Sequence, residues 1–183
     1  LPDGVVDTDM LAANAVTAAK ATGSAKGITM VDVWTLSSNY VYTNVNNNAI
    51  DFGFVQTGSY SAKFGNAMTE SSGVFTFPET GIYEVVFESS YNGSTTSRYI
   101  NHSIQKVISG TASGISTKYG SLDVDTSQSY YGTTHVRAFV DITNVTTDKV
   151  QFLINAPVAI NLLTAHSSNF ILSAFYFIRI GDT

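Results

Sequence analysis

Histidine, the side chain best suited to proton transfer and metal binding near neutral pH, is rare in this 183-residue chain. His102, His135 and His166 are widely spaced in the sequence, and no H-E-x-x-H motif is present. We interpret each as a hydrogen-bonding residue of a strand surface or core rather than as a metal ligand. The chain contains no cysteine, which excludes disulfides, thiolate metal sites and a cysteine nucleophile.

Acidic residues form two weak candidates for a cation site. Asp123 and Asp125 are two positions apart, so they share a strand face or a turn and could bind a hard cation together with amide or backbone oxygens. Asp51, close to the three asparagines at 46–48, is a second candidate of the same kind. The alternative, which we favour, is a solvated polar loop in each case. The sequence therefore predicts no metal site and no cofactor.

A hydrolytic pair of carboxylates is not evident either. Glu84 and Glu88 share a strand face, but four strand residues separate them by roughly 13 Å. Hydrolytic carboxylate pairs are at most about 9.5 Å apart. The G-x-S-x-G motif of serine hydrolases is also absent. We predict no catalytic residue, although a site formed between subunits remains open.

The composition indicates a domain built from β-strands. Charged residues make up 13% of the chain, against about a quarter in ordinary globular proteins, and Tyr and Phe contribute 10 and 11 residues. The net charge of −5 argues against a nucleic-acid partner. No apolar run is long enough to cross a bilayer, so we predict no membrane insertion.

Residues 1–27 differ from the rest of the chain. They are rich in alanine and contain no aromatic residue, and their apolar positions Val6, Leu11 and Val16 are too sparse to form a core alone. Such a segment becomes ordered when copies from several chains pack together. We therefore predict a stalk or attachment segment at 1–27. The alternative is a disordered leader or linker.

Residues 28–183 read as one head domain. Eight to ten short alternating segments recur about every ten residues and are separated by Gly, Asn and Ser turns. This pattern predicts an all-β fold, a jelly-roll β-sandwich of about ten antiparallel strands.

Residues 73–87 are the clearest part of this pattern. Phe75 and Phe77 alternate with polar or smaller residues, and so do the apolar residues that begin at Tyr83. Between the two runs, Pro78 and Gly81 are suited to a turn. The stretch predicts a hairpin whose aromatic side chains fill the core.

The closing segment at 169–179 does not alternate and is apolar on both faces. One face of an antiparallel strand usually meets water, so we infer that the second face meets another subunit. The alternative is a central strand covered by the protein's own loops. The residues predicted for a trimer interface are Phe170, Leu172, Phe175, Tyr176 and Phe177.

Three motifs resemble those of a known family. The first runs Gly73-Val74-Phe75-Thr76-Phe77-Pro78-x-x-Gly81-x-Tyr83 and is similar to the G-x-F-T-x-P-x-x-G-x-Y pattern of the globular domain of complement first-component subcomponent q. Residues 147–152 resemble a late strand entry of that family, with Thr147 in place of its usual Gly. Residues 168–177 resemble its closing strand. The resemblance implies the jelly roll that this family shares with tumour necrosis factor, and a homotrimer.

The leader resembles repeats of bacteriophage fibre and virion proteins. The matching residues are Asp3-Gly4-Val5, Leu11-Ala12 and Ala15-Val16-Thr17-Ala18-Ala19-Lys20. This resemblance implies a non-catalytic structural protein on the virion surface, whose residues 1–27 contact other virion proteins. The expected role is a trimeric fibre or spike head that contacts a polysaccharide or protein of the host surface. A capsid decoration or head-fibre protein is the alternative, and a hydrolase of host polysaccharide is a less favoured one.

The expected contacts with the host lie in loops rich in Tyr and Asn. Tyr can stack on sugars and Asn can bond hydroxyl groups. The candidates are Tyr91, Asn92, Tyr130 and Tyr131.

Overall fold

The computed structural model describes residues 27–43, 48–51, 53–56, 63–124, 130–163 and 171–183. These residues form thirteen strands and no helix. The strands build two antiparallel sheets that pack face to face, so the predicted all-β, jelly-roll-like sandwich is confirmed. Nearly all of the predicted stalk, residues 1–26, lies outside the described residues.

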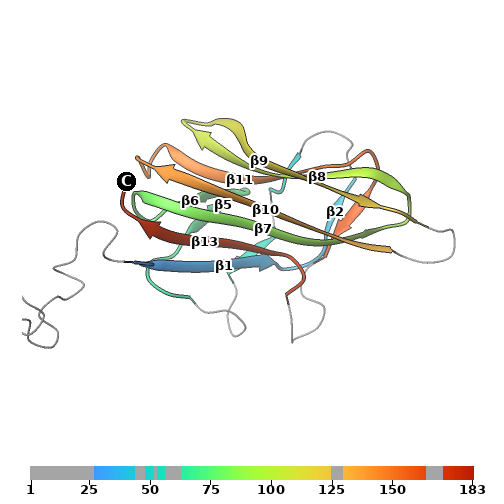
Figure 1. Ribbon diagram of the computed structural model, residues 1–183, viewed down its shortest axis with the longest axis horizontal. Helices are drawn as coiled ribbons and strands as arrows, with labels where there is room; N and C mark the ends of the chain where they lie inside the picture. Colours follow the sequence, from blue (N-terminus) through green and yellow to red (C-terminus); the bar gives the residue numbers. More distant parts are fainter. Residues whose placement is uncertain (1–26, 44–47, 52, 57–62, 125–129, 164–170) are drawn as a thin grey trace, which may run out of the picture.

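The larger sheet, sheet A, contains seven strands. They are β1 (Met30–Leu36), β2 (Tyr40–Tyr42), β4 (Phe54–Gln56), β7 (Gly81–Gly93), β10 (Tyr130–Ile142), β12 (Ile160–Leu162) and β13 (Ala174–Gly181). Strands β10, β7, β13 and β1 lie side by side along the length of the molecule (Figure 1).

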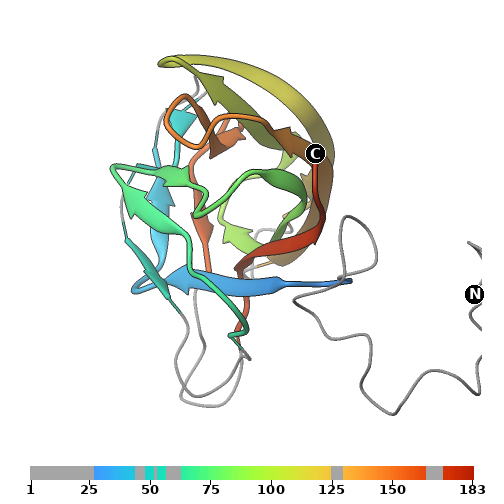
Figure 2. The same cartoon turned by 90° about the vertical axis from the view of Figure 1, so that its left-hand side faces the viewer.

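The second sheet, sheet B, contains six strands. They are β3 (Asn48–Ala49), β5 (Thr69–Ser71), β6 (Val74–Thr76), β8 (Ser97–Ile108), β9 (Thr111–Leu122) and β11 (Asp148–Asn155). Seen from the end that carries the C terminus, the strands of the two sheets curve around a common interior (Figure 2).

The pairing of the long strands defines two ends of the sandwich, which we call the basal end and the distal end. At the basal end, Met30 at the start of β1 pairs with Arg179 of β13, and Gly81 of β7 pairs with Ile142 of β10. At the distal end, Gly93 of β7 pairs with Tyr130 of β10. The leader therefore joins the head at the basal end, where β1 begins (Figure 1).

Residues 73–87 do not form the predicted hairpin. Strand β6 pairs with β5 and β11 in sheet B, whereas β7 pairs with β10, β12 and β13 in sheet A. The turn between them crosses from one sheet to the other. Gly81 has a φ of 144°, and a Cβ there would lie 2.6 Å from the carbonyl oxygen of Gly181, so the crossing requires glycine.

The aromatic residues of this stretch nevertheless fill the core, as predicted. Phe75, Phe77, Tyr83 and Phe87 are all buried. The rings of Phe77 and Tyr83 are 4.5 Å apart between centroids, one from each side of the crossing. Both strands direct their aromatic side chains inward, but from opposite layers of the sandwich.

Strand β13 is an interior strand of sheet A, held between β7 and β1. Phe175 and Phe177 point into the sandwich and are fully buried. Phe175 contacts Phe87 and Phe152, with ring centroids 4.8 and 4.7 Å apart, so the closing strand contributes the middle of the core.

Two stretches with residue types typical of loops and turns lie in strands. Residues 111–116 of the Gly- and Ser-rich stretch at 109–116 form the first half of edge strand β9. Asn92 and Gly93, a pair typical of hairpin turns, are the last residues of β7. The turn follows at 94–96 and leads into sheet B.

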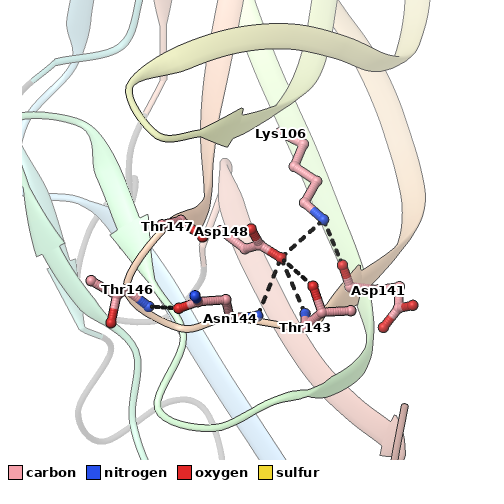
Figure 3. A network of polar contacts seen from close by, with 7 residues as sticks. All are labelled: Lys106, Asp141, Thr143, Asn144, Thr146, Thr147 and Asp148. Atoms are coloured by element: carbon pink, nitrogen blue, oxygen red, sulfur yellow. Dashed lines mark hydrogen bonds and ion pairs between the residues drawn. The ribbon is translucent and has the colours of Figure 1, made fainter.

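A polar network fixes the connection between β10 and β11 (Figure 3). Asp148 Oδ2 accepts hydrogen bonds from the backbone N–H of Thr143 at 3.1 Å and from its hydroxyl at 3.2 Å. Lys106 Nζ lies 3.3 Å from the same oxygen. Burial opposes ionisation of this carboxyl, but the N–H of Thr143 and the charge of Lys106 outweigh it and lower the pKa of Asp148.

Candidate functional site

The outer face of sheet A carries the candidate site. On β7, β10 and β13 alternate residues point away from the core, and the strand register aligns them in rows across the sheet. From the basal to the distal end these rows change from mixed apolar and acidic residues, through the residues that form ion pairs, to neutral polar residues. We name the three zones the basal patch, the charged belt and the distal pocket.

The basal patch is a group of apolar side chains at the end where the leader joins. Phe139 of β10 is 58% exposed, and Ile82 of β7 is exposed in the next outward-facing row, where it lies opposite Asp141. The register continues from Phe139 through Glu84 to Ile178 on β13. The patch is defined by Val31, Phe64, Ile82, Phe139 and Ile178.

The charged belt crosses the middle of the same face. Glu84 Oε1 lies 3.1 Å from Arg137 Nε, and Glu88 Oε1 lies 3.1 Å from His135 Nδ1. Tyr176 of β13 lines a shallow pocket of about 200 Å³ with these four residues. Burial, and then the charge of Glu88, raise the pKa of the Tyr176 hydroxyl.

The acidic side chains of the belt each have a partner on β10. Glu84 faces the guanidinium of Arg137, a permanent counter-charge, and Glu88 faces the imidazole of His135, which is a counter-charge only when it is protonated. Arg137 also lies over the ring of Phe139, 5.1 Å from its centroid, which connects the belt to the basal patch.

The distal pocket has a volume of about 530 Å³ and is larger than the pocket of the charged belt. It contains no carboxylate, ammonium, guanidinium or imidazole group among its described lining residues. They are Asn39, Ser90, Asn92, Tyr131, Gly132, Thr133, Leu163 and Leu172.

The structure brings together two of the four predicted binding residues. Asn92 and Tyr131 face each other across β7 and β10, and both line the distal pocket. Tyr130 is half-buried against the core at the start of β10. The prediction that these four residues lie in loops is wrong, because Tyr91 and Asn92 belong to β7 and Tyr130 and Tyr131 to β10. Tyr91 is also 1% exposed. Strand alternation turns Tyr91 inward and its neighbour Asn92 outward.

The residues predicted for a trimer interface divide between surface and core. Phe175 and Phe177 are inside the sandwich, so the expectation that their side chains face another subunit is corrected. Tyr176 is on the outer face and Leu172 lines the distal pocket. Phe170 lies outside the described residues. The outer face of β13, not its phenylalanine face, is what a partner could contact.

Sequence reasoning assigned no role to Phe139, Ile82, Leu163 or Thr133. The alternation at 136–142 did indicate that Arg137 and Phe139 share one face of a strand. An exposed Phe beside an Arg on a regular strand was therefore an available signal for a surface patch. Nothing in the sequence shows that Leu163 and Leu172 approach the same hollow.

The remaining candidates do not assemble into a metal site within the described residues, where no group of three potential ligands is found. His102 is buried in the core, and His135 belongs to the charged belt. Asp51 and Asp123 are exposed. Asp125 and His166 lie outside the described residues. In the part of the chain that the structure describes, no helix has the length and apolarity needed to cross a membrane.

Comparison with known proteins adds no assignment. No protein-family model matches the chain, and no curated protein matches it. The resemblance to the complement first-component and phage fibre families therefore remains a prediction from the motifs.

Proposed function

We propose that this protein is a non-catalytic structural component of a bacteriophage virion, the homotrimeric head of a fibre or spike that contacts the host surface. The observation that carries self-association is the basal patch on the outer face of sheet A. The link to a virion rests on the resemblance of residues 1–27 to phage fibre repeats.

The basal patch gives self-association a physical basis. A sheet face is a rigid platform, and the exposed ring of Phe139 and side chain of Ile82 lose contact with water when a second copy covers them. Complete burial of such a side chain contributes roughly 1.5–3 kcal/mol. Glu84 and Arg137 of the charged belt can be covered at lower cost than isolated charges because the two groups are already paired.

The ends of the sandwich fit the orientation of a fibre head. The leader joins at the basal end, and strands β7 and β10 carry the distal pocket about 35 Å away at the other end. If the leader is attached to the particle through other virion proteins, the distal end faces outward. Three copies then present three equivalent sites, which raises the avidity for a repetitive host surface.

The trimer is tested by measuring the mass of the full-length protein in solution. Sedimentation equilibrium should give three times the chain mass of 19.6 kDa. The variant Phe139→Lys should dissociate to a monomer, because it places a charge in the patch next to Arg137. The control Ile115→Lys, on exposed strand β9 of the other sheet, should keep the mass of the wild type.

A wild-type protein that sediments as a monomer at micromolar concentration would contradict the trimer. The position on the particle is tested separately by labelling intact virions with antibodies to the head domain. Label at the tips of fibres or spikes supports host contact. Label distributed over the capsid would replace that role with capsid decoration, with the same fold and assembly.

A further inference from the structure

The distal pocket has the dimensions and construction of a small-molecule site. Its volume of about 530 Å³ lies in the usual range for such pockets, roughly 300–1,000 Å³. Its lining comes mainly from strands of sheet A, so it is held by a hydrogen-bonded scaffold. Apolar side chains, Leu163 and Leu172, line it together with amide, hydroxyl and phenol groups.

The polar groups of the pocket are oriented before any ligand arrives. Asn161 Nδ2 donates a hydrogen bond to Asn92 Oδ1 at 3.0 Å, which fixes the rotamers of both amides. The Nδ2 group of Asn92 then remains to donate to a ligand. The hydroxyl groups of Ser90 and Thr133 lie in the same wall.

Tyr131 supplies a flat apolar surface at the edge of this wall. It is 70% exposed, although it sits in a regular strand directly opposite Asn92. The chain beneath it is fixed, because Gly132 packs so closely on Tyr91 that a Cβ would lie 2.3 Å from the ring. The exposed ring is therefore carried on a rigid position.

The backbone of β7 cannot recognise a peptide by strand addition at this place. Asn92 of β7 is paired on one side with Tyr131 of β10 and on the other with Asn161 of β12. Strand β10 pairs only with β7 among the described residues, so its outer edge is open, whereas the β7 wall of the pocket can recognise a ligand only through its side chains.

The described lining of the pocket contains no ionic group, which favours a neutral ligand in the pocket itself. Glu88 and His135 line the adjoining hollow of about 260 Å³, which shares Ser90, Thr133 and Leu172 with the pocket.

We infer that the distal pocket binds one neutral sugar ring of a surface glycan. The ring of Tyr131 stacks against the C–H face of the sugar, the amide of Asn92 donates to a sugar hydroxyl, and Leu163 and Leu172 contact its apolar edge. This inference rests on the proposed role in host contact and adds to it the class of ligand and the site.

The test uses the full-length protein and ligand-observed NMR. The probes are the neutral methyl glycosides of glucose, galactose, mannose and N-acetylglucosamine, compared with glucuronic acid and glucosamine. Saturation transfer from protein to at least one neutral glycoside is expected, and transfer to the charged sugars should be weaker. If none of the neutral glycosides shows saturation transfer at about 10 mM, the inference is overturned.

Two variants with equal exposure make the test specific to the pocket. Tyr131→Ala should weaken binding of the responsive sugar about tenfold or more, because the stacking surface is lost. Tyr119→Ala removes a ring that is also 70% exposed, but on β9 of sheet B, and should bind like the wild type. Equal affinities for the two variants would place the sugar elsewhere.

Binding of fluorescently labelled protein to host cells separates this inference from the proposed function. If the wild type and Tyr131→Ala bind cells equally well, the sugar pocket is wrong and the adhesive role stands. If the wild-type trimer binds no host cells, the adhesive role itself is wrong. Loss of cell binding in Tyr131→Ala, with retention in Tyr119→Ala, supports both.

Discussion

His102 is an ionisable side chain enclosed by hydrocarbon. Its ring lies 5.2 Å from that of Phe87 and 5.3 Å from that of Tyr91, and among the described residues neither ring nitrogen has a partner with ordinary hydrogen-bond geometry. Burial lowers the pKa of His102 to about 4, and the backbone of Ile100 opposes this only in part. The prediction that His102 is a hydrogen-bonding residue therefore does not match its surroundings in the core.

This histidine should make the fold sensitive to mild acid. The folded pKa is below that of the unfolded chain, so the unfolded state binds the proton more readily and stability is lost as the pH falls from about 6.5 to about 4. The loss should reach about 3 kcal/mol. Urea denaturation at pH 7 and pH 4.5 measures this loss.

The variant His102→Phe should show a smaller difference in the free energy of unfolding between the two pH values, whereas His135→Gln, on the surface, should behave like the wild type. Equal differences in all three would contradict the assignment.

Asp148 is a second residue on which the fold depends, through its network at the turn between β10 and β11. Asp148→Asn should lower the free energy of unfolding by about 1–3 kcal/mol, because the charge that Lys106 and the Thr143 N–H group face is removed. Urea titration at pH 7 checks this, with Asp141→Asn as an exposed control nearby.

The contribution of Asp148 is lost in acid, like that of His102, but for a different physical reason: partners stabilise the charged carboxylate, whereas burial disfavours the charged imidazole. The pKa of Asp148 is lower in the folded protein, so its contribution is complete above the unfolded value of about 3.8 and is lost as the pH falls towards the folded value. The wild type and Asp148→Asn should therefore converge in stability only in stronger acid. A constant difference down to pH 2 would show that the carboxylate charge is not what stabilises the turn.

At the scale of elements, the close packing of Gly132 of β10 on Tyr91 of β7 is a constraint on the paired strands. Gly132→Ala should destabilise the protein by about 1–3 kcal/mol, because its Cβ would lie 2.3 Å from the Tyr91 ring. Gly114→Ala, in strand β9, meets no atom within 4 Å and should be neutral or slightly stabilising. Thermal unfolding followed by circular dichroism compares the two. A Gly132→Ala protein as stable as Gly114→Ala would mean that Tyr91 moves freely.

The sequence predicted which residues of the elements face inward more reliably than it predicted their partners. Phe75, Phe77 and Tyr83 are core residues, as their alternation indicated. The same alternation fits a hairpin within one sheet or a crossing between two sheets. What separates these cases is pairing with β10 and β11, whose partner residues lie 37 to 77 positions further along the chain.

Other elements carried too little local pattern to be recognised. Strand β9 is polar, rich in Gly and Ser, and exposed along most of its length, so it has no alternation to detect. Strand β12 has only three residues. The distal pocket depends on the register that places Tyr131 opposite Asn92, and residue types alone do not specify register.

At the scale of the whole molecule, the order of the three zones matters more than any one of them. The basal patch, the charged belt and the distal pocket follow one another along the same face, and the leader joins next to the first of them. Self-association near the attachment point and ligand binding at the far end can then coexist on a single sheet. The two proposals consequently predict independent phenotypes for Phe139→Lys and Tyr131→Ala: loss of assembly in the first, and loss of sugar binding by an intact trimer in the second.

The central position of β13 also sets the order in which the protein can be completed during synthesis. Strand β1 pairs with β4 on one side and with β13 on the other. The second edge of β1 is therefore unpaired until Arg179 and the rest of β13 have been synthesised. Until residues 174–181 leave the ribosome, β1 and β7 keep open edges and the core lacks Phe175 and Phe177. An incomplete chain is therefore prone to aggregation. Premature termination anywhere upstream of β13 should yield insoluble protein and not a smaller folded head.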